Sequence, residues 1–269
     1  MGLSSNVLWH QTNKKGLVGI LKSKKLYFSY CLENLLASGD FKGIAFPMVS
    51  LSDLPLSEFG EGKWAYGNYA IGLSRNWGIQ RGFNPVCYCQ LGSDYLKNMQ
   101  LNLELAIKIG DNIMIEKALY PFAYMKLVEG PLPRKRFLKY RYYDEKEIRL
   151  VPNKERIDGF APFLIDGQYD SYKNTHGNSL LGAIGVDFSY SDICYLLVEN
   201  EKGRKDVQTL LRNLGVDITQ MVILTKQEVL GDIVGNNHNE ELPKIKIGYS
   251  NISDLAKIVG SEYFDKIKM

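Results

Sequence analysis

Cysteine and histidine are scarce in this 269-residue sequence, which contains four of the first and three of the second. A disulfide-stabilised scaffold needs a denser set of cysteines, so that class is excluded. Cys87 and Cys89 are two residues apart and would share one face of a strand. A zinc site would need two more ligands nearby, and the histidines are scattered. The cysteines therefore predict structural thiols, and no metal is expected.

Long apolar runs are also missing. No apolar run reaches the roughly 18 residues that suggest a membrane-spanning helix. The N-terminus lacks a basic segment followed by an apolar run and a cleavage site, so no membrane association and a cytoplasmic location are expected. The net charge of +3 is too small to indicate a nucleic-acid partner by itself. The chain shows neither an internal repeat nor an RNA-binding or zinc module.

What is present is a mixture of β-prone and amphipathic segments, with hydrophobic and charged fractions typical of a globular protein. Strands are expected at 7–10, 26–30, 43–51, 69–74, 84–89, 147–151, 191–198 and 221–224. Helices are expected after residue 12 and at 75–81, 94–128 and 206–214, with a break or the first turn of a further helix at Pro121. Residues 60–68 and 154–180 are expected to be loops, and 130–136 a basic connector. The pattern predicts one α+β domain over 1–269, with a core of about 7–230 and a peripheral C-terminal helix at about 250–268.

The segment Glu145-Lys146-Glu147-Ile148-Arg149 places two carboxylates at the start of a β-prone run. In a strand, Glu145, Glu147 and Arg149 would share one face, and Ile148 would point into a core. Two carboxylates on one face repel each other unless a cation lies between them or a ligand uses them. The alternative is a solvated edge strand in which Arg149 pairs with Glu147.

A second stretch, Trp9-His10-Gln11-Thr12, ends the first expected strand. His10 and Thr12 can hydrogen-bond a sugar and an amide of one ligand, although a lone histidine is more often structural. Farther along, Tyr66, Tyr69 and Ser74 lie in or beside an aromatic strand. The order His-x-Thr, aromatic strand and Glu-x-Glu resembles the site of ADP-ribosyltransferases of the His-Tyr-Glu class.

That resemblance implies an ADP-ribosyltransferase-like split core of mixed and antiparallel strands with flanking helices, and NAD+ as the substrate. His10, Thr12 and Ser74 would bind NAD+, and Tyr66 or Tyr69 would stack on its nicotinamide. In this class a fixed carboxylate stabilises the positive charge that develops on the ribose when the glycosidic bond breaks.

The resemblance gives Glu147 the catalytic role, with Glu145 orienting the acceptor or the ribose. Arg149 would hold the carboxylates beside the cofactor. Two features depart from the pattern. Ile148 stands where relatives commonly have tryptophan, and no first-strand arginine for phosphate is identified. Arg75 is the nearest candidate for that role, and a surface role for it is the alternative.

A longer series of segments is similar to the AbiGi family of bacterial abortive-infection proteins. The matching segments are 8–12, 16–21, 44–56, 66–73, 77–78, 84–86 and 145–149, in order over roughly 7–230. That family is described as the antitoxin partner of a two-gene phage-resistance system. Membership would imply a cognate toxin as the partner.

Three functions follow from these resemblances. The first is a phage-defence enzyme that transfers ADP-ribose from NAD+ to a nucleic acid or protein. The second is a non-catalytic antitoxin that grips a toxin, and the third is an NAD+ glycohydrolase. Retained His10 and Glu147 favour an enzyme, whereas the missing tryptophan favours a binding protein.

Overall fold

The computed structural model describes residues 5–37, 42–59, 66–132, 137–157, 159–219 and 221–231. Fourteen strands are found in these ranges: β1 Val7–Thr12, β2 Lys25–Glu33, β3 Ile44–Ser52, β4 Tyr69–Ser74, β5 Asn84–Pro85, β6 Cys87–Cys89, β7 Met125–Leu127, β8 Glu129–Leu132, β9 Phe137–Arg141, β10 Glu147–Leu150, β11 Leu164–Ile165, β12 Leu180–Asp187, β13 Ile193–Val198 and β14 Val222–Thr225. The helices are α1 Lys14–Ser23, α2 Arg75–Arg81, α3 Asp94–Ile109, α4 Asn112–Leu119, α5 Asp166–His176, α6 Glu201–Asn213 and α7 Lys226–Gly231. The protein is therefore α+β.

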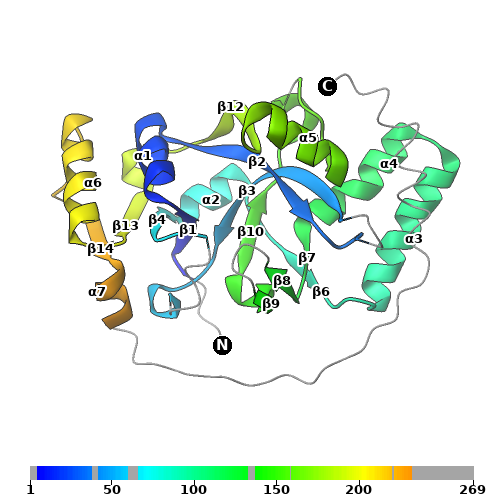
Figure 1. The fold of residues 1–269 in the computed structure, drawn as a ribbon, viewed down its shortest axis with the longest axis horizontal. Coiled ribbons are helices and arrows are strands. Elements are labelled where there is room, and N and C mark those ends of the chain that lie inside the picture. Colours follow the sequence, from blue (N-terminus) through cyan, green and yellow to red (C-terminus); the bar gives the residue numbers. More distant parts are fainter. Residues whose placement is uncertain are drawn as a thin grey trace.

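One ten-stranded sheet organises the described residues, in the order β12-β2-β3-β1-β4-β13-β14, with β10 and β11 also paired to β3. Its pairs are antiparallel except for β13 with β14. Figure 1 shows α6 and α7 at one end of the molecule and α3 and α4 at the other. The mostly antiparallel core with flanking helices agrees with the α+β class expected from sequence.

β3 brings the two sequence stretches of interest together. Its last residue, Ser52, is the register partner of Trp9 in β1 and of Glu147 in β10. Residues more than a hundred positions apart in sequence thus lie on either side of β3 at the same level. The predicted candidate residues of β1 and β10 are held on a common frame of backbone hydrogen bonds.

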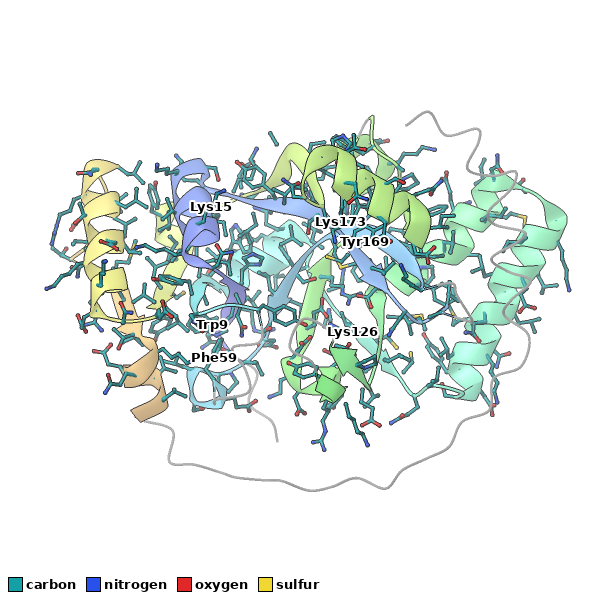
Figure 2. All side chains as sticks on the ribbon, viewed as in Figure 1. Trp9, Lys15, Phe59, Lys126, Tyr169 and Lys173 are labelled. Carbon is teal, nitrogen blue, oxygen red and sulfur yellow. The ribbon has the colours of Figure 1, made fainter. Side chains whose placement is uncertain are left out.

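The largest apolar cluster packs α1, α2, α5 and α6 against the main sheet, and smaller clusters lie beside it. Beside β1 and β4, Trp9 packs edge-on against Phe59, with ring centroids 5.0 Å apart. A separate cluster joins α3 and α4 to β3 and β7. Figure 2 shows Trp9 and Phe59 together, and Lys126 of β7 apart from them near the middle of the molecule. The Lys126 side chain is only 12% exposed and needs anionic partners, because burial of an unpaired charge is costly.

Short helices begin where the sequence provides a cap. Asn13 accepts a hydrogen bond from the Gly16 amide at the start of α1, and Ser74 accepts one from the Trp77 amide at the start of α2. Both caps satisfy amides that have no partner within the helix. The predicted helices after residue 12 and at 75–81 are therefore confirmed.

Three expectations are wrong. The 94–128 helix is broken after Ile109 by Gly110, which has a φ of +75°, and the region continues through α4 into strand β7. The expected loop at 154–180 contains α5, a polar helix in which Tyr169 is buried. The basic connector begins as strand β8 in a hairpin with β9.

Some expected segments lie outside the residues that the structure describes. The C-terminal helix at 250–268 lies outside the described residues, as do 60–65 of the expected loop and 133–136 of the connector. Within the part that the structure describes, no helix is both long enough and apolar enough to cross a membrane.

Candidate functional site

Strand β10 carries Arg149 into the interior, where only 1% of the arginine surface is exposed. β10 pairs with β3 on one side and β5 on the other, and all four of its residues are buried. The solvated edge strand is therefore wrong, although the expected pairing of Arg149 with Glu147 is confirmed. The Arg149 guanidinium donates to both oxygens of Glu147, with Nε–Oε1 at 2.7 Å, and to Glu33.

The remaining guanidinium nitrogen of Arg149 also has backbone partners. Its Nη1 atom donates to the carbonyl oxygens of Ala123 and Met125, at 2.8 and 3.3 Å. All three guanidinium nitrogens thus donate to groups of the chain. The arginine joins β10 to the end of β2 and to the start of β7, which is a structural connection.

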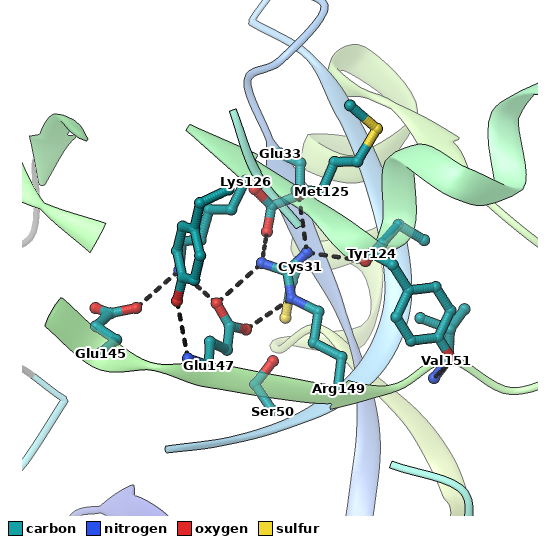
Figure 3. Close-up of polar contacts among 12 residues, drawn as sticks. Cys31, Glu33, Ser50, Tyr124, Met125, Lys126, Glu145, Glu147, Arg149 and Val151 are labelled. Carbon is teal, nitrogen blue, oxygen red and sulfur yellow. Dashed lines mark hydrogen bonds and ion pairs between the residues drawn. The ribbon is translucent and has the colours of Figure 1, made fainter. Parts of the chain in front are cut away.

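Lys126 supplies the cation that two neighbouring carboxylates require. Its Nζ atom donates to Glu147 Oε2 at 2.7 Å and to Glu145 Oε2 at 2.9 Å. The same ammonium lies 4.7 Å from the ring centroid of Tyr142, close enough for a cation–π contact. Figure 3 shows Lys126 and Arg149 on opposite sides of Glu147. The requirement for an intervening cation is met by the protein itself.

Glu33, Lys126, Glu145, Glu147 and Arg149 form one charge cluster. Glu145 contributes to it from a turn. Residues Tyr142–Glu145 form a 3-10 helix, and Lys146 follows with a φ of +43° before β10 begins. The expectation of one strand face for Glu145 and Glu147 is wrong, because this left-handed residue separates them. The turn nevertheless brings both carboxylates to Lys126. Tyr66 donates its hydroxyl to Glu145 Oε1 at 2.6 Å.

The local charges set the protonation states of the cluster. Burial favours the neutral form of Glu147, but Arg149 and Lys126 outweigh it and hold the pKa of Glu147 well below its usual range. For Glu33, burial outweighs Arg149 and raises the pKa. Burial acts to lower the pKa of Lys126, but the negative charges of Glu147 and Glu145 outweigh burial and raise this pKa well above its usual value. The cluster therefore keeps Glu147 ionised, and Glu33 is its more easily protonated carboxylate.

His10 lies on β1, which pairs with β3. Its Nδ1 is 3.1 Å from the backbone oxygen of Ser50, which is the register partner of Arg149. Burial lowers the pKa of His10, so the neutral imidazole donates this bond at neutral pH. The Tyr66 amide donates to the Gln11 side chain at 3.4 Å. Hydrogen bonds therefore join Tyr66 to Gln11 and to Glu145, and Lys126 joins Glu145 to Glu147. His10 follows Trp9, which shares its register level with Ser52 and Glu147, so the His10 side chain points to the opposite face of the sheet.

Other predicted cofactor-binding residues are placed differently. Thr12 and Tyr69 are register partners at one end of the β1–β4 pair, and Ser74 lies at the opposite end as the cap of α2. Tyr69 is buried in the core beside Gly203 of α6. Arg75, the candidate for phosphate, forms an ion pair with Asp53.

The sequence reading missed Glu33, Lys126 and Tyr88. The Tyr88 hydroxyl accepts the Glu147 amide hydrogen at 2.8 Å. Lys126 was hidden inside a stretch that resembled a long helix, and Glu33 ends a strand with nothing local to distinguish it. One signal was present: two carboxylates that lie two residues apart at the start of a strand repel each other unless a cation lies between them, and Lys126 of β7 is that cation.

Comparison with known proteins identifies the family. A family model described as "Putative abortive phage resistance protein AbiGi, antitoxin" matches residues 24–199. The abortive phage resistance protein AbiGi of Lactococcus lactis subsp. cremoris is 26% identical over 194 residues, which cover 62% of this chain and 76% of the relative. No solved structure matches. The matched region contains Glu33, Lys126 and Arg149 together with both glutamates of β10 and its turn, and the chain belongs to the AbiGi family of abortive phage resistance proteins.

Proposed function

We propose that this protein acts in abortive phage resistance as an antitoxin, by binding a cognate toxin rather than by consuming NAD+. The observation that carries the proposal is that side chains of the protein complete the hydrogen bonding of the two glutamates in the charge cluster. All four carboxylate oxygens of Glu145 and Glu147 accept bonds from the side chains of the protein itself. The description of the family as an antitoxin supports the same conclusion.

In a binding protein, the charge cluster would hold neighbouring strands in a fixed arrangement. Arg149 links the end of β2 to β10 and to the backbone before β7, and Lys126 links β7 to the turn before β10. Neither link requires a ligand. A binding protein needs a fixed surface, and buried ion pairs with complete hydrogen bonding hold neighbouring elements in one arrangement.

A growth assay tests this proposal. The product of the neighbouring gene would be expressed from an inducible promoter, alone and together with this protein. Growth arrest that is relieved by co-expression, together with a stable complex of the two purified proteins, is the expected result. Arrest that persists beside well-folded protein would overturn the proposal.

ADP-ribosyl transfer is the second candidate, and the position of Tyr66 favours it. Tyr66 joins Gln11 of β1 to Glu145, and His10 lies on the same strand. Tyr66 as a residue is 41% exposed, and its hydroxyl contacts Glu145, so an accessible aromatic residue lies beside that carboxylate. If Tyr66 released Glu145, the carboxylate would be available to stabilise a positively charged ribose. The acceptor would be a nucleic acid, a protein or, for a glycohydrolase, water.

Labelled NAD+ separates the two candidates. Wild-type protein and Glu147→Gln would each be incubated with labelled NAD+ and lysates of uninfected and phage-infected cells. The antitoxin proposal predicts intact NAD+ with both proteins. Label on macromolecules with wild type alone would establish transfer, and free ADP-ribose with nicotinamide would establish hydrolysis.

A further inference from the structure

Helix α3 has two apolar faces. Leu96, Leu103 and Ala106 are buried against the cluster that joins α3 to the sheet. On the opposite side, Leu101, Leu105 and Ile109 are 48%, 48% and 62% exposed. Residues at i, i+4 and i+8 lie above one another on a helix, so these three form a continuous row about 12 Å long.

This row, here called the α3 stripe, consists of Leu101, Leu105 and Ile109. Figure 1 shows α3 at an end of the molecule, on the far side from α6 and α7. A further apolar residue, Ile113 at the start of α4, is 64% exposed. A surface helix normally places charged and polar residues on its outer face, so a helix with apolar residues on both faces indicates a second contact.

The sequence of the stripe is suited to a second copy of the same helix. If two α3 helices pair in antiparallel orientation about Leu105, Leu105 meets its own equivalent. Leu101 then lies opposite Ile109 of the second copy, at both ends of the contact. A symmetric contact of this kind buries the whole row on both molecules and leaves no part of it facing water.

The charges beside the stripe fit the same arrangement. Glu104 and Lys108 lie on one flank of the stripe, a single turn apart. Equivalent flanks meet in an antiparallel pair, so Lys108 approaches Glu104 of the second copy, and the reciprocal pair forms by symmetry. The flanks are thus complementary to themselves.

We infer that the α3 stripe is a self-association surface through which two copies of this protein form an antiparallel helix-pair dimer. A contact made by one helix is at the small end of specific interfaces. The dimer therefore forms reversibly and depends on concentration. The inference is independent of the antitoxin proposal, because it is measured on this protein alone.

Sedimentation velocity over a range of concentrations tests the inference. The wild-type protein is expected to move from the chain mass of 30.5 kDa toward twice that value as concentration rises. Leu105→Glu places two like charges at the centre of the contact, and its dimer dissociation constant is expected to rise at least roughly tenfold. Ile79→Glu is the matched control, because Ile79 is 64% exposed on α2, outside the stripe. It is expected to dimerise like the wild type.

A charge exchange gives a sharper test. Glu104→Lys and Lys108→Glu each place like charges across the symmetric contact and are expected to weaken the dimer. The double variant restores opposite charges and is expected to regain most of the wild-type association. A protein that stays monomeric at every concentration, or a dimer that Leu105→Glu leaves unchanged, would overturn the inference. Single variants that weaken association without recovery in the double would overturn the antiparallel register.

Discussion

Two ion pairs of nearly equal length lie in very different surroundings. Lys14 of α1 and Asp206 of α6 are 2.5 Å apart, with side chains 49% and 44% exposed. Lys126 and Glu147 are 2.7 Å apart, with side chains 12% and 7% exposed. The first pair exchanges its partners readily for water, whereas the second has been removed from water at a high desolvation cost. Burial, and not distance, decides which pair the fold depends on.

The largest expected effect is that of Arg149→Ala. It leaves Glu147 and Glu33 buried with one cation fewer, and the Ala123 carbonyl without its guanidinium partner. Breaking a buried ion pair by removing one partner costs about 3–5 kcal/mol. Urea denaturation followed by circular dichroism measures the loss in free energy of unfolding. Arg149→Lys should recover only part of it, because an ammonium cannot form the same fork of bonds. A loss below about 1 kcal/mol, the size typical of surface pairs, would contradict the comparison.

Lys126→Met should have a smaller effect than Arg149→Ala. Glu147 keeps both bonds to Arg149, and Glu145 keeps the bond to Tyr66. The methionine fills a similar volume but leaves two carboxylates facing each other, so we expect a loss of about 2–4 kcal/mol. The same urea experiment measures it. A stability equal to that of the wild type would show that the lysine is dispensable.

The pH dependence of stability should reveal the two kinds of carboxylate. The pKa of Glu147 is lower in the folded than in the unfolded protein. Glu147 therefore contributes to the free energy of unfolding above its unfolded-state pKa, and this contribution is lost as the pH falls toward its folded-state pKa. The pKa of Glu33 is higher in the folded than in the unfolded protein. Glu33 therefore contributes to the free energy of unfolding at low pH, and this contribution is lost as the pH rises through its folded-state pKa. Urea unfolding between pH 7 and pH 2 should therefore show a shallower acid loss for Glu147→Gln and a steeper one for Glu33→Gln. Equal slopes for the two variants would contradict these assignments.

The smallest effect is expected from Asp206→Asn. This change removes the exposed pair between α1 and α6 but keeps the size of the side chain. Water replaces the lost partner of Lys14, so urea denaturation should show no measurable change. A clear loss of stability would mean that exposed and buried pairs matter alike, and the contrast between the two regions would fail.

The sequence predicted local structure better than long-range contacts. Asn13 and Ser74 are capping residues whose roles depend on a few neighbours, and both helices that they begin were anticipated. The polar helix α5 was missed because Tyr169 is its single buried residue, so no apolar period marks it. β7 was missed because Pro121 follows two real helices, and the apolar spacing continues beyond them.

The candidate site was predicted in part for the same reason. Glu145 and Glu147 are two residues apart and repel each other, so a cation between them was expected from local sequence alone. The structure contains such a cation. The identity of that cation as Lys126, and the role of Glu33, depend on strand pairing that no local pattern encodes. Ser74 was given a ligand role from its place in the order, and the structure shows that its hydroxyl caps α2. The ligand role of Ser74 stays a prediction.

The central claim is that the charge cluster supports the fold and that the protein works by binding. Phage plating efficiency, measured beside the free energy of unfolding for Glu145→Gln, Glu147→Gln and Lys126→Met, tests this claim most directly. The account predicts that resistance falls only as far as stability falls. A Glu145→Gln or Glu147→Gln variant with wild-type stability and no resistance would contradict it, because a purely structural carboxylate has no other way to affect function.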